Sequence, residues 1–425
     1  MEDCFAESVP QSSAQAATVA PVEYKEKRLF TPGPLGVSRT TKEAMLYDLG
    51  SRDQQFMQVV KSIRSSLLRL AGVSEEEYTT ILMPGSGTFA VESVITTSVP
   101  REGGHLLVLS NGCYAERIAQ IATCLGIRTT VLECPEDAPL DLDKVERTLL
   151  SDPSFTNVVM VHCETSSGML NPVEAVGELL GRTGSKASFF VDAMSSFGSI
   201  PLDFQRANRL DWLVSSANKC IQGVPGFAFI IARRAALEAC RGRARSLSFD
   251  LYEQHKGLEE KGQFRFTPPT HALLAFHQAL RELQAEGGPK ARGRRYKANL
   301  AVLRKGMAEL GFREFLAHVE EGREERFIIT SFLYPEDPKF SFERFYSLLG
   351  ERGFCIYPGK VTKADCFRIG TIGHLFPSGL LFPFCSFFCL FVGLEDLVSF
   401  NEEAPFYFFC FRSCGADRKS QPKQT

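Results

Sequence analysis

The sequence predicts an α/β fold in which a large domain holds a mostly parallel sheet and a smaller α+β domain follows it. Short apolar runs alternate with amphipathic segments of helical period from about residue 41 to residue 286. Runs that are apolar throughout predict strands buried on both faces, and helices between them predict parallel neighbours. The alternation stops at Gly287 and Gly288, where we expect the second domain to begin.

The individual elements follow from the same patterns. Strands are predicted over five apolar runs, at residues 79–83, 106–110, 158–162, 188–192 and 227–231. Helical periodicity predicts helices over residues 115–125 and 142–150, and in the second domain over 290–310 and 342–353. Two further strands are expected at 327–332 and 366–370. Ligands of parallel α/β folds collect at the carboxyl ends of strands, so residues that follow these runs are the first functional candidates.

The two ends of the chain are expected to lie outside both domains. Residues 1–24 are small and polar, carry Glu2, Asp3 and Glu7, and have no arginine, which predicts a disordered arm rather than a targeting peptide. The large domain would then span 25–286 and the small one 287–378. Residues 379–425 are rich in phenylalanine and lack helical or strand period, which predicts a poorly ordered tail. Their apolar stretch is shorter than the roughly 20 residues of a membrane span.

Composition argues against several function classes. A net charge of −2 gives no electrostatic basis for binding nucleic acid or an anionic membrane. The 13 cysteines are scattered without a CxxC pair, which favours reduced thiols and a cytoplasmic location, with a mitochondrial one left open. The seven histidines lack ligand spacing, so no metal site is expected.

Lys219 and Asp192 form the most informative pair of residues. Asp192 ends an apolar run, and Lys219 follows about one strand-plus-helix unit later. A pyridoxal 5'-phosphate enzyme needs this arrangement, because the lysine holds the cofactor as a Schiff base and the aspartate pairs with the pyridinium nitrogen. The alternatives are a solvated surface lysine and an aspartate that caps a helix.

A glycine-containing turn predicts a phosphate site. The segment Gly-Ser-Gly-Thr at residues 85–88 follows the strand at 79–83 and opens a helix. Its glycines let backbone amides approach an anion, Ser86 and Thr88 add hydroxyl donors, and a helix N-terminus favours negative charge. An ordinary strand-to-helix turn is the alternative interpretation.

Several motifs resemble the class V, fold type I pyridoxal phosphate aminotransferases. They are LFTPGP (29–34), GSGT (85–88), VDAMSSFG (191–198) and NKC (218–220). Four more resemble the 2-aminoethylphosphonate–pyruvate transaminase branch of that family: HCETSSGMLNP (162–172), NKCIQGVPG (218–226), SLSFDLY (246–252) and GQFRFTPPTH (262–271). The match runs from about residue 29 to 378. It implies transfer of the amino group of 2-aminoethylphosphonate to pyruvate, giving phosphonoacetaldehyde and alanine, in a homodimer with shared active sites.

The resemblance also implies a role for each matching residue. Lys219 is implied to bind the cofactor and then to act as base and acid in the proton shift, while Asp192 keeps the pyridine nitrogen protonated. Cofactor contacts within the chain are implied for Ser86, Gly87, Thr88, Tyr114 and Thr165. Thr267 is implied to reach across the dimer interface to the partner's cofactor phosphate.

Two arginines are candidates for binding the substrate. Arg368 matches the small-domain arginine that holds the substrate's acidic group in this family. A planar guanidinium suits both a carboxylate and a phosphonate, so one residue would serve both half-reactions. Arg39 is the second candidate. A surface arginine on a strand is the alternative for Arg368.

Two departures from the family pattern keep other functions open. His255 stands where the family usually has a tryptophan, and residues 379–425 replace an amphipathic helix. The alternatives are another class V activity, such as alanine–glyoxylate or serine–pyruvate transamination, and a catalytically impaired isoform with a replaced C-terminus. Asn218 argues against the first, because those relatives usually have glutamine there. A desulfurase is also less consistent, since Cys355 and Cys366 lie in predicted strands rather than on a mobile loop.

Overall fold

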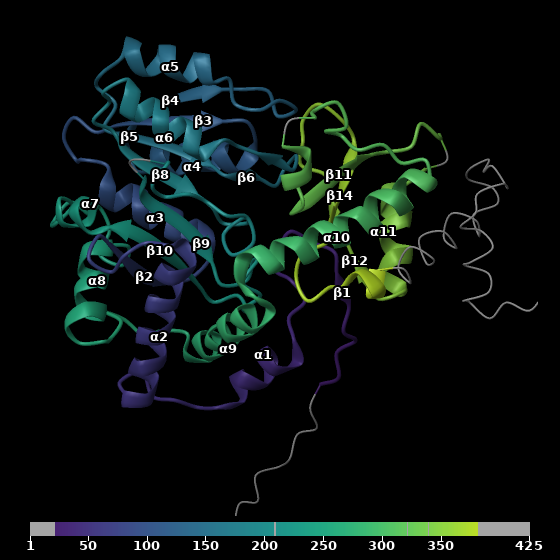
Figure 1. Cartoon of the computed structure of the whole chain (residues 1–425), viewed down its shortest axis with the longest axis horizontal. Helices are drawn as coiled ribbons and strands as arrows, with labels where there is room; N and C mark the ends of the chain where they lie inside the picture. The colour runs from purple at the N-terminus through teal and green to yellow at the C-terminus, as the bar shows by residue number, and fades with distance from the viewer. Residues whose placement is uncertain (1–21, 208–209, 321, 339, 381–425) are drawn as a thin grey trace, which may run out of the picture.

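The computed structural model describes residues 22–207, 210–320, 322–338 and 340–380. Most of the expected N-terminal arm and C-terminal tail, residues 1–21 and 381–425, therefore lies outside the described residues. Figure 1 shows a central sheet among helices and a smaller body beside it, with α10 (Gly288–Glu309) running between them.

A seven-stranded sheet forms the centre of the larger part of the described chain. In spatial order its strands are β2 (Tyr78–Pro84), β10 (Phe227–Arg233), β9 (Leu210–Ser216), β8 (Ser188–Asp192), β5 (Asn157–Val161), β3 (His105–Ser110) and β4 (Arg128–Glu133). β10 runs antiparallel to β2 and β9, and the pairs from β9 to β4 are parallel. The predicted mostly parallel sheet is confirmed.

Helices cover this sheet because their apolar positions recur on one face. They are α1 (Arg39–Glu43), α2 (Gln54–Ala71), α3 (Gly87–Ser98), α4 (Cys113–Cys124), α5 (Leu142–Ser151), α6 (Val173–Arg182), α7 (Arg234–Glu238), α8 (Leu251–Glu260) and α9 (Thr270–Glu286), with a 3-10 turn η1 (Ala44–Leu46) after α1. In α2, Asp53 caps the first turn, Gly72 ends the helix in a left-handed conformation, and Val60, Ile63 and Leu67 are buried. A strand-plus-helix unit was expected between Asp192 and Lys219. The strand is β9, but the described residues 193–207 before it form turns instead of a helix.

The smaller body is built from α10, α11 (Phe342–Glu351) and short strands. β11 (Ile329–Leu333), β14 (Cys366–Gly370) and β13 (Tyr357–Pro358) form one antiparallel sheet, and a 3-10 turn η2 (Arg323–Glu325) precedes it. β12 (Phe354–Cys355) pairs with β1 (Arg28–Leu29) from the start of the described chain. A hairpin of β6 (Cys163–Glu164) and β7 (Met169–Leu170) lies at the edge of the larger part.

The core of the smaller body draws on both parts of the chain. Phenylalanine rings of α11 and β14 pack together, with Phe345 and Phe367 at 5.3 Å between ring centroids. Phe30, Ile200 and Cys220 belong to the same buried cluster although they precede residue 287. Because packing is shared in this way, the domain boundary near residue 287 stays a prediction.

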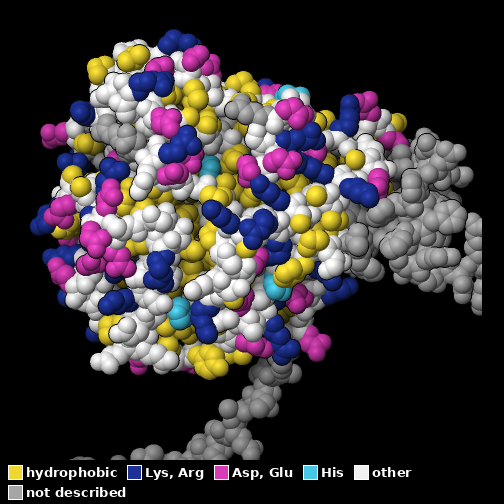
Figure 2. Space-filling model, viewed as in Figure 1, with side chains coloured by type: hydrophobic (Ala, Val, Ile, Leu, Met, Phe, Trp, Pro, Cys, Tyr) yellow, Lys and Arg dark blue, Asp and Glu magenta, His cyan; other side chains and the backbone are white. Residues whose placement is uncertain are grey.

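The surface of the described residues is mixed in character. On the face seen in Figure 2, acidic and basic side chains alternate across most of the surface. Within the described part of the chain, every helix is too short or too polar to cross a bilayer.

Candidate active site

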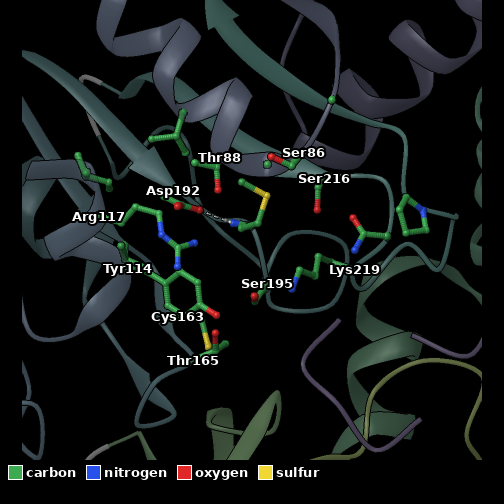
Figure 3. Close-up of a pocket in the computed structure, with 18 of the residues that line it drawn as sticks. Ser86, Thr88, Tyr114, Arg117, Cys163, Thr165, Asp192, Ser195, Ser216 and Lys219 are labelled. Carbon is green, nitrogen blue, oxygen red and sulfur yellow. Dashed lines mark hydrogen bonds between the residues drawn. The ribbon is translucent and has the colours of Figure 1, made fainter. Parts of the chain in front are cut away.

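A cavity of about 670 Å³ opens at the carboxyl ends of the central strands. Its wall collects residues from the segments that follow β2, β3, β5, β8 and β9. Seven residues predicted from the sequence line it together: Ser86, Gly87, Thr88, Tyr114, Thr165, Asp192 and Lys219. Figure 3 shows Asp192, Thr88 and Ser86 along one wall, with Lys219 across the cavity from Arg117 and Tyr114.

Lys219 extends into the cavity from the turn after β9. Its Nζ donates a hydrogen bond to the carbonyl oxygen of Pro32 at 2.8 Å. The chain passes so close at Gly33 that a Cβ there would lie 2.6 Å from Nζ, and φ at Gly33 is +128°. Burial lowers the pKa of Lys219 to about 8, helped by the charge of Arg368 and opposed by Asp192 and two nearby thiols. A lysine with this pKa is neutral far more often near pH 7 than an ordinary lysine, whose pKa is 10.5.

Asp192 ends β8 and faces the same space. Its Oδ1 accepts a hydrogen bond from the backbone N–H of Met194 at 2.9 Å. Burial raises the pKa of Asp192 to about 6, the negative charge of Glu164 raises it further, and Lys219 and Arg117 lower it. A cationic partner in the cavity would therefore favour the ionised carboxylate.

The N-terminus of α3 presents backbone amides to the cavity. Ser86 is the N-cap residue with an extended backbone, and within the described residues its side chain makes no capping hydrogen bond and the first turn carries no acidic residue. Gly85 has φ +112°, and a Cβ on Gly87 would lie 2.4 Å from Sδ of Met194. The helix start is thus open to an anion and too closely packed for a larger side chain.

Arg368 lies behind Thr165 rather than on the cavity wall. It is buried in β14, where Nε donates to the carbonyl of Pro358 and Nη1 donates to that of Thr165, both at 2.9 Å. Its charge still acts on Lys219. Its predicted contact with substrate stays a prediction.

Two other predicted residues are not brought to this cavity. Arg39 lies in α1, is largely exposed, and pairs with Glu43 at 2.6 Å one helical turn away. Thr267 lines a separate surface hollow of about 330 Å³ together with Ser51 and Arg52. Their predicted roles, at the substrate and at a partner's phosphate, stay predictions.

His255 is placed away from the cavity. It lies in α8, where Nδ1 is 3.4 Å from Oγ1 of Thr79, and burial lowers its pKa to about 4. The His255 ring therefore packs between α8 and β2.

Sequence reasoning missed several residues of the site. Arg117 lines the cavity one helical turn after Tyr114, and this i,i+3 spacing was the available signal. Glu164 is fully buried and accepts hydrogen bonds from the backbone N–H groups of Tyr114, Ala115 and Ser166. It fixes the start of α4 against the β6–β7 hairpin, a contact that only the fold reveals.

Residues 41–366 match the class-V aminotransferase family. The chain belongs to this family. This class-V aminotransferase is 50% identical over 365 residues to a 2-aminoethylphosphonate–pyruvate transaminase of Syntrophobacter fumaroxidans, covering 85% of this chain and 96% of the relative. A protein of the same name from Bacillus cytotoxicus is 50% identical over 83% of this chain and 94% of its own length. The resemblance inferred from the motifs is confirmed.

Solved structures of the family share the fold. An alanine–glyoxylate aminotransferase of Nostoc sp. superimposes with a TM-score of 0.78 at 23% identity, covering 89% of this chain and 99% of its own. A ureidoglycine–glyoxylate aminotransferase of Bacillus subtilis gives a TM-score of 0.79 at 21% identity, covering 94% of this chain and 100% of its own. The predicted fold type I architecture is confirmed.

Proposed function

We propose that this aminotransferase binds pyridoxal 5'-phosphate and moves the amino group of 2-aminoethylphosphonate to pyruvate. The products are phosphonoacetaldehyde and alanine, so the amine and the carbonyl oxygen exchange carriers and no external oxidant is needed. One observation carries the proposal: an amine and a carboxylate from different strand ends share a cavity with an open helix N-terminus. The choice of substrates rests on relatives of that name with half of their residues identical.

The cavity residues fit the cofactor group by group. The open start of α3, with the hydroxyls of Ser86 and Thr88, suits a phosphate dianion. Asp192 supplies a carboxylate for a protonated ring nitrogen, and Lys219 supplies the amine that holds an aldehyde. When bound, the cofactor supplies an electron sink for the carbon that carries the substrate's amine.

Lys219 is placed to move the proton in the reaction. Its Nζ would take a proton from the carbon that bears the transferred amine and would then give a proton back. A pKa of about 8 suits both directions, because the amine is a base strong enough to accept the proton and still releases it near neutral pH. The carbonyl of Pro32 holds Nζ over the cavity before substrate arrives.

Asp192 is placed to hold positive charge. Its carboxylate sits in a buried site where an ion pair is weakly screened, so a cationic nitrogen opposite it is strongly favoured. Met194 N–H fixes the orientation of the carboxylate through Oδ1. Removal of the carboxylate would leave the cavity able to bind an anion but unable to stabilise that cation.

We infer a homodimer in which Thr267 serves the partner's site. Thr267 lies outside the cavity of its own chain and next to Phe266, whose side chain is 51% exposed. Aromatic side chains are enriched at interfaces between proteins. Light scattering of the purified chain should give twice the mass of one chain. Phe266→Asp should shift the measured mass towards that of a single chain. A monomeric mass for the unaltered chain would contradict the homodimer.

Product formation tests the proposed reaction directly. The cofactor-loaded chain is incubated with 2-aminoethylphosphonate and pyruvate, and alanine is followed by NMR; alanine with glyoxylate and serine with pyruvate serve as rival pairs. We expect the phosphonate pair to react fastest and Lys219→Ala to abolish the reaction. Faster reaction of a rival pair would move the chain to that activity. Cofactor binding without any turnover would support the impaired isoform.

A further inference from the structure

Two cations meet at the ring of Tyr114 on the rim of the cavity. The guanidinium carbon of Arg117 lies 5.0 Å from the ring centroid, and Nζ of Lys360 lies 5.1 Å from it. Arg117 comes from α4, whereas Lys360 comes from the segment between β13 and β14. The two parts of the chain therefore each contribute one positive charge to the same aromatic ring.

Neither cation is engaged in an ion pair with a described residue, although the charge of Arg117 lowers the pKa of Asp192. Within the described part of the chain, no carboxylate forms an ion pair with Arg117 or Lys360. The buried carboxylate of the β6–β7 hairpin, Glu164, accepts hydrogen bonds from the N–H groups of Tyr114, Ala115 and Ser166. A cation–π contact holds a cation by only about 0.5–1 kcal/mol at an exposed site, so both side chains can still turn towards an anion.

Arg117 lines the cavity, and Lys360 lies against the Tyr114 ring beside it without being a lining residue itself. Tyr114 and Arg117 belong to the cavity wall, and Figure 3 shows the Arg117 guanidinium beside the Tyr114 ring and facing the open space. Arg368 lies deeper and already donates to the carbonyls of Thr165 and Pro358. A ligand that carries more than one negative charge therefore needs cations beyond Arg368.

We propose that Arg117 and Lys360, which both contact the Tyr114 ring, form a clamp. This clamp binds the phosphonate group of the amino donor and favours it over a carboxylate. The inference rests on the proposed function and adds to it the residues that select the donor. A phosphonate can take up a second negative charge as pH rises through its second ionisation, whereas a carboxylate carries one charge at most. Two unpaired cations thus stabilise the phosphonate more than the carboxylate.

Binding of two amine-free probes tests the clamp without turnover. The cofactor-loaded full chain is titrated calorimetrically with ethylphosphonate and with propanoate, in the unaltered form and in Arg117→Gln, Lys360→Met and the double variant. We expect the preference for ethylphosphonate over propanoate to fall by roughly tenfold in the double variant and by less in each single one. Arg117→Lys keeps the charge and should retain most of the preference.

Matched variants and kinetics separate the clamp from other roles. Arg147→Gln in α5 and Lys305→Met in α10 remove exposed charges elsewhere in the chain. They should leave the preference for ethylphosphonate over propanoate unaltered. In steady-state assays, the Arg117→Gln and Lys360→Met variants should show a rise in KM for 2-aminoethylphosphonate that exceeds the change in kcat. Equal weakening of both probes would assign Arg117 and Lys360 a structural or cofactor role, and an unchanged preference would overturn the clamp. Absence of turnover in the unaltered chain would contradict the proposed function, while the probe titration would still decide on the clamp.

Discussion

At the scale of single residues, the lowered pKa of Lys219 gives a prediction about cofactor uptake. A neutral amine is required to attack the aldehyde, and the amine is protonated below its pKa. Because burial brings that pKa from the ordinary 10.5 to about 8, the uptake rate should rise with pH and reach half its maximum near pH 8. Stopped-flow absorbance of the cofactor-free chain mixed with pyridoxal 5'-phosphate measures this rate. A half-maximum above pH 10 would contradict the lowered pKa.

Asp192 gives a second prediction at this scale. Asp192→Ala removes the carboxylate opposite the cavity but leaves the α3 N-terminus and Lys219 in place. We expect the variant to retain some cofactor and to lose on the order of a hundredfold or more in kcat. Asp143→Ala, an exposed change in the first turn of α5, is the control. A loss of less than tenfold in Asp192→Ala would remove the residue from the proposed chemistry.

The residues that sequence reasoning found share a simple property. Asp192, Ser86 and Thr88 directly follow or end apolar runs, so the rule that ligands meet at strand ends places them without knowledge of contacts. Arg117 and Glu164 were missed because their importance depends on which segments pack together. The carbonyl of Pro32 lies 187 positions from Lys219 in sequence, and no local pattern signals that contact.

At the scale of elements, the close approach of Gly112 to the β6–β7 hairpin fixes where α4 begins. The φ of Gly112 is 166°, so the backbone accepts any residue and only space is limiting. A Cβ there would lie 2.5 Å from both Cγ of Glu164 and Oγ of Ser166. Gly112→Ala should lower the free energy of unfolding by about 1–3 kcal/mol, measured by urea denaturation.

The control for this change is Gly50→Ala. A Cβ on Gly50 would have its nearest neighbour, Cβ of Asp53, 4.0 Å away, so the substitution meets open space. The two variants should therefore differ clearly in their urea midpoints. Equal midpoints would show that the hairpin moves freely and that Glu164 does not set the position of α4.

The element predictions found most of the buried strands, but they missed the buried β9 and the more exposed β4. β3 and β14 are buried along their whole length, and β8 is buried after its first residue, which makes all three largely apolar runs. β4 is an edge strand with mostly exposed side chains, so it carries no such run and was not predicted. Between Asp192 and Lys219 a strand-plus-helix unit was expected, but the described residues between β8 and β9 form turns.

At the scale of the whole molecule, the start of the chain and its C-terminal part together enclose Lys219. The carbonyl of Phe30 accepts a hydrogen bond from Gly370 N–H at 3.0 Å, and that of Gly36 accepts one from His374 N–H at 2.8 Å. The intervening segment carries the Pro32 carbonyl that holds Nζ. Sequence patterning cannot reveal this arrangement, because it depends on contacts between opposite ends of the described chain.

Tyr296 gives a stability prediction at this scale. Its buried hydroxyl accepts from Gln222 Nε2 at 2.5 Å and from Gly373 N–H at 3.1 Å, which ties α10 to the turn after Lys219. Tyr296→Phe leaves these donors without that acceptor and should lower the free energy of unfolding by about 1–3 kcal/mol. Urea denaturation measures the change. Tyr24→Phe, at an 87% exposed position, should have no effect, and equal stability of both variants would contradict the proposed tie.

A single half-reaction tests the central claim most directly. The cofactor-loaded chain is placed in a spectrophotometer, and 2-aminoethylphosphonate is added without any acceptor. The account predicts loss of the visible absorbance of the loaded protein, followed by its return when pyruvate is added. Serine in place of the phosphonate should act far more slowly. A spectrum that responds to serine or alanine but not to 2-aminoethylphosphonate would contradict the account.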